Sequence, residues 1–203
     1  MYVKICGLRE PQHAARAAAE LADAVGVVMS ASSPRNATEE QATAVIAAAK
    51  QERHDIDTVL VVREMPAALA ARTAARLGFD VLQLHGGYTR EDYADAATIH
   101  PRVWRAASLT NEPGLTAGDY AEERLLVDSA VAGSGEPWDL ELIERAELGT
   151  DWILAGGLSP ENVADAIHAA RPGGVDVSSG VESAPGEKSL ELISGFIAAA
   201  RRA

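Results

Sequence analysis

The chain has 203 residues, of which 47% are apolar and 24% are charged, a composition typical of a globular protein and not of a disordered one. Its single cysteine excludes an internal disulfide, one cysteine and five histidines are too few for a zinc framework, and no apolar run approaches the roughly 20 residues that span a bilayer. The formal net charge of −12 argues against nucleic-acid binding, but it permits a small anionic substrate held by a local positive site.

Short β-branched runs alternate along the chain with alanine-rich helical stretches. The predicted strands cover residues 2–6, 24–29, 58–62, 81–85, 102–107, 124–128, 152–156 and 174–178. The predicted helices cover residues 10–22, 38–50, 65–78, 89–99, 138–146, 159–171 and 189–202. Thr38 and Gln41 have the spacing of a capping box, and Ser159 before Pro160 is typical of a helix start. Residues 108–123 are rich in turn formers, so we expect the fifth helix to be short or irregular.

Eight βα units in about 200 residues predict an α/β fold, a (β/α)₈ TIM barrel of eight parallel strands with outer helices. An open doubly wound sheet is the alternative, because repeat counting does not show closure. No linker or low-complexity stretch marks a boundary, so we expect residues 1–203 to form one domain. No basic segment followed by an apolar one opens the chain, so we expect no signal peptide and a cytoplasmic location.

A barrel enzyme has its active site at the carboxyl ends of the strands, and Cys6 lies at the first of these ends. Strand alternation places Tyr2, Lys4 and Cys6 on one face, pointing into the barrel, and Val3 and Ile5 on the other. A lone cysteine is commonly a small buried filler. The other interpretation is a catalytic thiolate, which needs nearby positive charge that Lys4 could supply.

Three further polar residues lie at or near predicted strand ends. Asp128 is either a turn-capping carboxylate or a general acid whose pKa is raised by the apolar barrel mouth. His85, which shares a strand face with Gln83, is either a hydrogen-bonded core residue or part of a site. Arg35, in the loop SASSPRNAT, is either a solvated side chain or a guanidinium positioned to bind a carboxylate across the barrel mouth.

Two glycine- and serine-containing loops follow the last two predicted strands. Gly156 and Gly157 precede a helix start, an arrangement that brings backbone N–H groups close to an anion. Ser178, Ser179 and Gly180 repeat this pattern after the eighth strand. Barrels commonly bind a phosphate between these two loops, although each could be a plain tight turn.

These segments together resemble the phosphoribosylanthranilate isomerases of tryptophan biosynthesis. The matching segments are KICGL, SPR, FDVLQLHG, LLVDS, GSG before WD, AGGLSPENV and GVDVSSGVESAPGEKS, and they run in order from Lys4 to Ser189. The resemblance implies an Amadori rearrangement of N-(5-phosphoribosyl)anthranilate to the 1-deoxyribulose phosphate, with no metal or organic cofactor. It implies Cys6 as general base and Asp128 as general acid. The implied binding residues are Arg35 toward anthranilate, Asp176 near the sugar, and Gly156, Gly157, Ser179 and Gly180 at the phosphate, and we expect His85 to bind the substrate as well.

The chemistry of the residues agrees with these implied roles. Furanose ring opening needs a proton at the ring oxygen, which a carboxylic acid such as Asp128 can give. The Schiff base that results acidifies the C2 proton, which a thiolate at Cys6 can remove. The enolamine then tautomerises to the ketone, and anchoring the phosphate and the carboxylate at opposite ends holds the ribose between acid and base.

Two stretches depart from the family pattern. The chain has GVVMSASSPR where an aromatic, lysine-containing stretch before SPR is usual, and VLVVRE where a pattern like VGVFVN is usual. The first of these changes predicts fewer aromatic contacts and one cation less around the anthranilate.

Other functions remain as alternatives. The related sugar isomerase of histidine biosynthesis uses aspartates after strands one and five, where this chain has Cys6 and no aspartate. A non-catalytic sugar-phosphate-binding barrel, or a barrel acting on another phosphorylated substrate, is also possible. The expected partner is a small anionic phosphosugar, with no nucleic acid and no membrane, and we expect a monomer, with a homodimer as the alternative.

Overall fold

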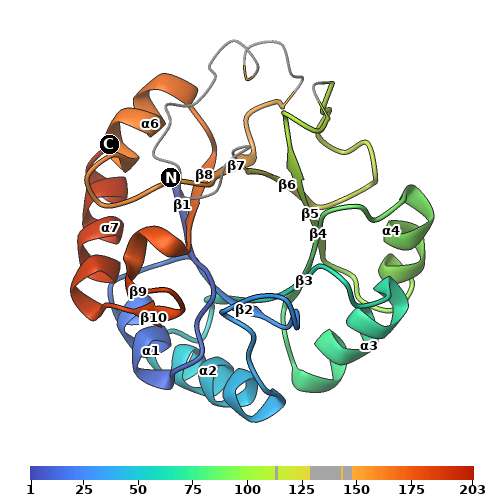
Figure 1. Cartoon of the computed structure of the whole chain (residues 1–203), viewed down its shortest axis with the longest axis horizontal. Helices are drawn as coiled ribbons and strands as arrows, with labels where there is room; N and C mark the ends of the chain where they lie inside the picture. Colours follow the sequence, from blue (N-terminus) through green and yellow to red (C-terminus); the bar gives the residue numbers. More distant parts are fainter. Residues whose placement is uncertain (113, 129–142, 144–147) are drawn as a thin grey trace.

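The computed structural model describes residues 1–112, 114–128, 143 and 148–203. Eight parallel strands pair in chain order, and β1 pairs with β8 so that the barrel closes (Figure 1). The strands are β1 (Tyr2–Ile5), β2 (Ala24–Val28), β3 (Asp57–Val62), β4 (Val81–His85), β5 (Val103–Ser108), β6 (Arg124–Asp128), β7 (Trp152–Ala155) and β8 (Gly174–Val177). All eight predicted strands and the closed barrel are confirmed, and the open doubly wound sheet is wrong.

Helices form an outer ring around the barrel (Figure 1). They are α1 (Pro11–Ala19), α2 (Glu39–Glu52), α3 (Ala67–Leu77), α4 (Arg90–Ala97), α6 (Val163–Ala170) and α7 (Leu190–Arg202). Thr38 and Gln41 form the predicted capping box of α2. The start of α6 differs from the prediction, because residues 160–162 form a turn and the helix begins at Val163. The Ser159 hydroxyl still accepts a hydrogen bond from the Glu161 amide in that turn.

No helix in the described ranges of the chain is long and apolar enough to cross a bilayer.

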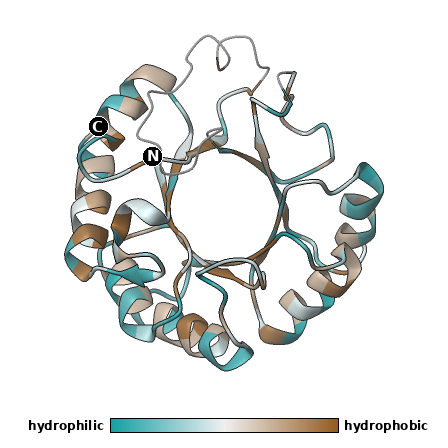
Figure 2. Cartoon of the chain, in the orientation of Figure 1, coloured by the Kyte–Doolittle hydropathy of each residue, from teal (hydrophilic) through white to brown (hydrophobic). Residues whose placement is uncertain are grey.

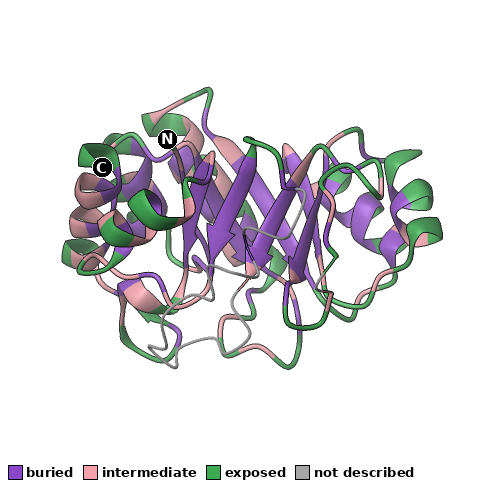
Figure 3. Cartoon of the chain, turned by 90° about the horizontal axis from the view of Figure 1, so that it is seen from above, coloured by how far each residue is buried: buried purple, intermediate pink, exposed green. Residues whose placement is uncertain are grey.

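Strand alternation divides the apolar side chains into two layers. One face of each strand packs under the helices, and Val3 and Ile5 belong to that layer. The other face fills the barrel interior, where Cys6, Val61 and Trp104 lie. The strands are therefore buried on both sides, while the helices are buried toward the barrel and polar outward (Figures 2 and 3). This inside–outside order places every second residue at a strand end in the barrel mouth.

Between β5 and β6, the described residues form turns and no helix, which agrees with the irregular alternative of the prediction and not with a short helix. The side chain of Arg105, which belongs to β5, and the ring of Tyr120 lie together on the outer face of β5. The buried Arg105 guanidinium stacks 3.7 Å from the centre of the Tyr120 ring and pairs with Glu112. Leu109 and Leu115 are also buried there. The helix predicted for residues 138–146 lies outside the described residues, apart from Ile143.

A small structure after β8 was not predicted from the sequence. A 3₁₀ turn (Ser179–Val181) leads into a hairpin of β9 (Glu182–Ala184) and β10 (Glu187–Lys188). The hairpin precedes α7 and lies beside the barrel mouth (Figure 1). It brings Glu182 and Lys188 toward the strand ends, with consequences for the site.

Candidate active site

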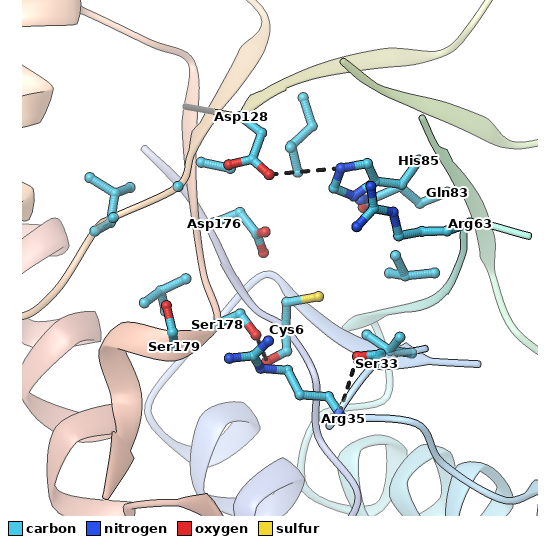
Figure 4. Close-up of a pocket in the computed structure, with 18 of the residues that line it drawn as sticks. Cys6, Ser33, Arg35, Arg63, Gln83, His85, Asp128, Asp176, Ser178 and Ser179 are labelled. Atoms are coloured by element: carbon cyan, nitrogen blue, oxygen red, sulfur yellow. Dashed lines mark hydrogen bonds and ion pairs between the residues drawn. The ribbon is translucent and has the colours of Figure 1, made fainter. Parts of the chain in front are cut away.

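A cavity of about 280 Å³ opens at the carboxyl ends of the strands (Figure 4). Nearly all residues predicted for the site line it, namely Cys6, Arg35, His85, Asp128, Gly156, Gly157, Asp176 and Ser179. Gly180 does not line the cavity and instead packs against the backbone of Leu158. Arg63, Gln83 and Ser178 complete much of the polar wall. The strand ends of a closed barrel converge on one rim, which is why residues far apart in sequence meet here.

Cys6 lies at the end of β1 above a buried ion pair. The Lys4 ammonium, fully buried, lies 2.9 Å from Oδ1 of Asp176. Burial raises the pKa of the Cys6 thiol above its ordinary value, and the nearby Lys4 charge only partly offsets this effect. Burial also opposes the charge on Lys4, yet Asp176 and Cys6 raise its pKa overall, so Lys4 stays charged. Lys4 therefore does supply positive charge beside the thiol, as predicted, but the resting thiol stays mostly protonated at neutral pH.

The neighbouring strand β2 leaves room for the sulfur. A Cβ added to Gly26 would lie 2.9 Å from the Sγ of Cys6, closer than such atoms normally approach. Glycine at this inward position therefore lets the thiol point into the cavity, where Figure 4 shows it.

Asp128 and His85 face each other across another part of the cavity (Figure 4). Oδ2 of Asp128 lies 3.7 Å from Nε2 of His85. Burial, followed by the charges of Arg63 and Lys4, lowers the pKa of His85 to about 4. The imidazole is therefore neutral at pH 7, so it offers one donor and one acceptor without adding charge.

The two predicted phosphate loops pack directly on each other. Gly156 and Gly157 adopt φ values of +84° and +65°, which favour glycine. A Cβ on Gly180 would overlap the carbonyl oxygen of Leu158 in the loop after β7. Gly180 thus allows the two loops to meet. Ser179 and Gly157, one from each loop, both line the cavity.

Arg35 forms a bidentate ion pair with a carboxylate of the protein itself. Its Nε and Nη2 donate to the two carboxylate oxygens of Glu182, at 2.6 and 2.9 Å. Lys188 donates to the same carboxylate at 2.8 Å. Burial opposes the charge of Glu182, but the hydrogen bonds from Arg35 and Lys188 hold its pKa at about 2. The sequence predicted a carboxylate partner for Arg35 across the mouth, and the partner seen here is on the hairpin.

Sequence reasoning missed several polar residues of this region. Glu182 and Lys188 gave no signal, because the hairpin that carries them was not predicted. Arg63 was noted only as a departure in the third strand, although the alternation of Val59 and Val61 would have placed it inside. Oε1 of Gln83 is buried with no hydrogen-bond partner in the described part of the chain, which leaves an acceptor for a ligand.

Among the described side chains, no three His, Cys, Asp or Glu residues form a cluster that could hold a metal ion.

The chain is similar over nearly its full length to proteins named as isomerases. Residues 3–199 match the family model described as N-(5'-phosphoribosyl)anthranilate (PRA) isomerase. The N-(5'-phosphoribosyl)anthranilate isomerase of Pelobacter propionicus is 37% identical over 98% of this chain and 95% of its own. The crystal structure of TrpF from Jonesia denitrificans is 49% identical, with a TM-score of 0.89 over 99% of this chain and 97% of that one. A phosphoribosyl anthranilate isomerase in complex with reduced 1-(o-carboxyphenylamino)-1-deoxyribulose 5-phosphate is 29% identical, with a TM-score of 0.82 over the full length of both chains.

Proposed function

This chain belongs to the N-(5'-phosphoribosyl)anthranilate isomerase family, and from that premise we propose that Cys6 and Asp128 carry out the proton transfers of its reaction. The reaction is the Amadori rearrangement of N-(5'-phosphoribosyl)anthranilate, an aminoaldose, to 1-(2-carboxyphenylamino)-1-deoxyribulose 5-phosphate, an aminoketose of tryptophan biosynthesis. The substrate is an anionic phosphosugar. It needs an acid for ring opening, a base for C2, and an anchor at each end.

Ring opening begins the reaction. The Asp128 carboxyl donates its proton to the furanose ring oxygen as the C1–O bond breaks, and the nitrogen lone pair forms the C=N bond of a protonated Schiff base. Asp128 is left as a carboxylate. The positive charge on nitrogen now acidifies the C2–H bond.

Proton removal from C2 completes the rearrangement. The Cys6 thiolate takes the C2 proton, and the C–H electron pair forms a C1=C2 double bond while the C=N electrons return to nitrogen. This neutral enolamine carries the C2 hydroxyl, and its tautomerisation gives the ketone. A proton enters at C1 and one leaves the C2 hydroxyl, so no oxidant, metal or cofactor is required.

Binding groups at both ends hold the ribose between the acid and the base. The loops with Gly156, Gly157, Ser179 and Gly180 bind the phosphate through backbone N–H groups and the serine hydroxyl. Asp176 and His85 contact the sugar from the cavity wall. Arg35 keeps three N–H donors that Glu182 does not use, which can bind the aryl end.

One observation supports this proposal above the others. Cys6 on β1 and Asp128 on β6 line the same cavity from strands three positions apart around the barrel, and the loops after β7 and β8 lie between them. An acid and a base on different sides of one sugar is the arrangement that the two proton transfers need.

Turnover of the family substrate tests the proposed function. Phosphoribosylanthranilate made in situ should lose its fluorescence when purified, reduced protein is added. Tight binding of the reduced product analogue without turnover would instead support a non-catalytic binding barrel. Turnover of the histidine-pathway aminoaldose at a comparable rate would contradict the assignment to a single pathway.

We further propose that residues 1–203 act as one domain and as a monomer in the cytoplasm. The described residues of a single chain supply both proposed proton-transfer groups and the phosphate loops, so the site needs no second copy. Light scattering on a size-exclusion column should give one chain per particle, and a particle of two chains would contradict the monomer.

A further inference from the structure

Arg63 enters the cavity directly after β3, which, like β5, carries no predicted site residue. Val59 and Val61 of β3 point into the barrel, and Arg63, two residues farther, continues that inward series. Its side chain lines the cavity, and Figure 4 shows its guanidinium reaching inward beside His85. Arg63 as a whole is exposed, so it extends over the rim of the cavity from the solvent side.

The two arginines of the cavity wall differ in their partners. The Arg35 guanidinium already binds the Glu182 carboxylate through two hydrogen bonds. Arg63 forms no ion pair or hydrogen bond through its side chain within the described residues, although it faces a polar cavity. A guanidinium offers five donors in a fork that matches a carboxylate. Arg63 therefore presents this fork to whatever occupies the cavity.

The position of Arg63 fits the aryl end of the substrate. In the closed barrel, β3 lies four strands from β7 in either direction, directly across from the first phosphate loop. Arg35 packs against Gly7 and Ser178 on the β1–β8 side, closer to the phosphate loops. A substrate with its phosphate on the loops after β7 and β8 extends its other end toward β3. The aryl carboxylate is the anion at that end.

We propose that Arg63 binds the aryl carboxylate of the substrate and so selects for a carboxylated arylamine. The proposal rests on the proposed function, because it places the phosphate on the loops after β7 and β8. It makes Arg63 a specificity-determining residue in addition to Arg35, which stays tied to the hairpin through Glu182.

A pair of substrates separates carboxylate binding from other effects of Arg63. Ribose 5-phosphate condensed with anthranilate gives the carboxylated substrate, and condensed with aniline it gives the same aminoaldose without the carboxylate. Wild type, Arg63→Gln and Arg63→Lys are compared on both at pH 8, where the His85 imidazole is neutral whether or not Arg63 is present. Arg72→Gln, an exposed arginine on α3, is the control for the loss of one charge.

Arg63→Gln should raise KM for the carboxylated substrate roughly 10- to 100-fold, with little change in kcat. For the aniline analogue, KM of Arg63→Gln and of wild type should agree within about twofold. Arg63→Lys keeps the charge without the fork and should lie between the two, and Arg72→Gln should match wild type on both substrates.

Equal rises in KM on both substrates, or no rise on either, would overturn the carboxylate assignment. Circular dichroism of both Arg63 variants excludes misfolding as the cause, and because Arg63 is exposed we expect both to fold. Wild type that turns over neither substrate would contradict the proposed function itself, whereas wild type active on the carboxylated substrate with an unchanged Arg63→Gln contradicts only this inference.

Discussion

At the scale of single residues, the thiol of Cys6 combines a buried position with a charged neighbour. Burial raises its pKa, while Lys4 works in the opposite direction from within an ion pair with Asp176. A raised pKa lowers the fraction of the thiol that is ionised at neutral pH, but it makes each thiolate that forms a stronger base. A stronger base suits the proton abstraction that we propose for Cys6.

Alkylation of Cys6 should report this raised pKa directly. Cys6 is the only cysteine in the chain, so the rate of modification by iodoacetamide reads a single thiol. The rate should rise with pH through a midpoint above the ordinary thiol value of about 8.5. The Cys6→Ser protein supplies the blank. A midpoint at or below that of free cysteine would show that Lys4 outweighs burial.

At the scale of elements, the strands and most helices could be predicted because each carries its own local signal. Every strand is an apolar run ended by turn formers, and the alternation along β1 correctly separated Lys4 and Cys6 from Val3 and Ile5. The segment after β5 gave no such signal, because its buried contact between Arg105 and Tyr120 uses residues with no helical or strand period.

The residues of the site could be predicted from the sequence, but the ion pairs that they form could not. Strand ends identified the residues of the cavity wall, since closure of the barrel brings them together. The Arg35–Glu182 pair joins residues 147 positions apart through an unpredicted hairpin, so no local pattern could reveal it. Arg63 was hidden for another reason, because an arginine after a strand is usually a solvated residue.

The contact between the two proposed phosphate loops can be tested at Gly180. In Gly180→Ala, the added Cβ overlaps the Leu158 carbonyl and forces the loops apart. We expect a loss of about 2 kcal/mol of stability, a fall in Tm of roughly 4–8 °C, and a rise of KM for the phosphosugar of about tenfold. Gly87→Ala, where a Cβ meets open space, is the matched control. A Gly180→Ala protein with the Tm and KM of wild type would show that the loops do not depend on this contact.

At the scale of the whole molecule, the two ends of the chain meet and help to close the barrel. β1 pairs with β8, and α7 follows the hairpin back to the N-terminal residues, so the termini lie side by side (Figures 1 and 3). Hydrogen bonds from Arg201 stabilise this junction. This arginine donates to the Met1 carbonyl at 2.6 Å, to the Leu21 carbonyl, and to the Asp23 carboxylate at 2.7 Å. This face lies away from the cavity, so we assign it to stability.

Arg201→Ala should destabilise the whole barrel without changing its chemistry. Loss of these hydrogen bonds should lower the free energy of unfolding by about 2 kcal/mol, measured by urea denaturation. Arg202→Ala removes the neighbouring arginine, which is exposed like Arg201 but forms no side-chain hydrogen bond or ion pair within the described residues, and should have less than about 0.5 kcal/mol of effect. Equal stability of the two variants would contradict the role of Arg201, and kcat should stay at the wild-type value in both.

The central claim is that Cys6 and Asp128 are the base and the acid of the isomerisation, and the most direct test is the turnover of phosphoribosylanthranilate by Cys6→Ser and Asp128→Asn beside wild type. Each variant keeps the size of its side chain but removes the proton-transfer group. We predict that kcat falls by at least about 10²-fold in both, while circular dichroism and binding of the reduced product analogue match wild type. A variant that retains most of the wild-type kcat would contradict the role assigned to its residue.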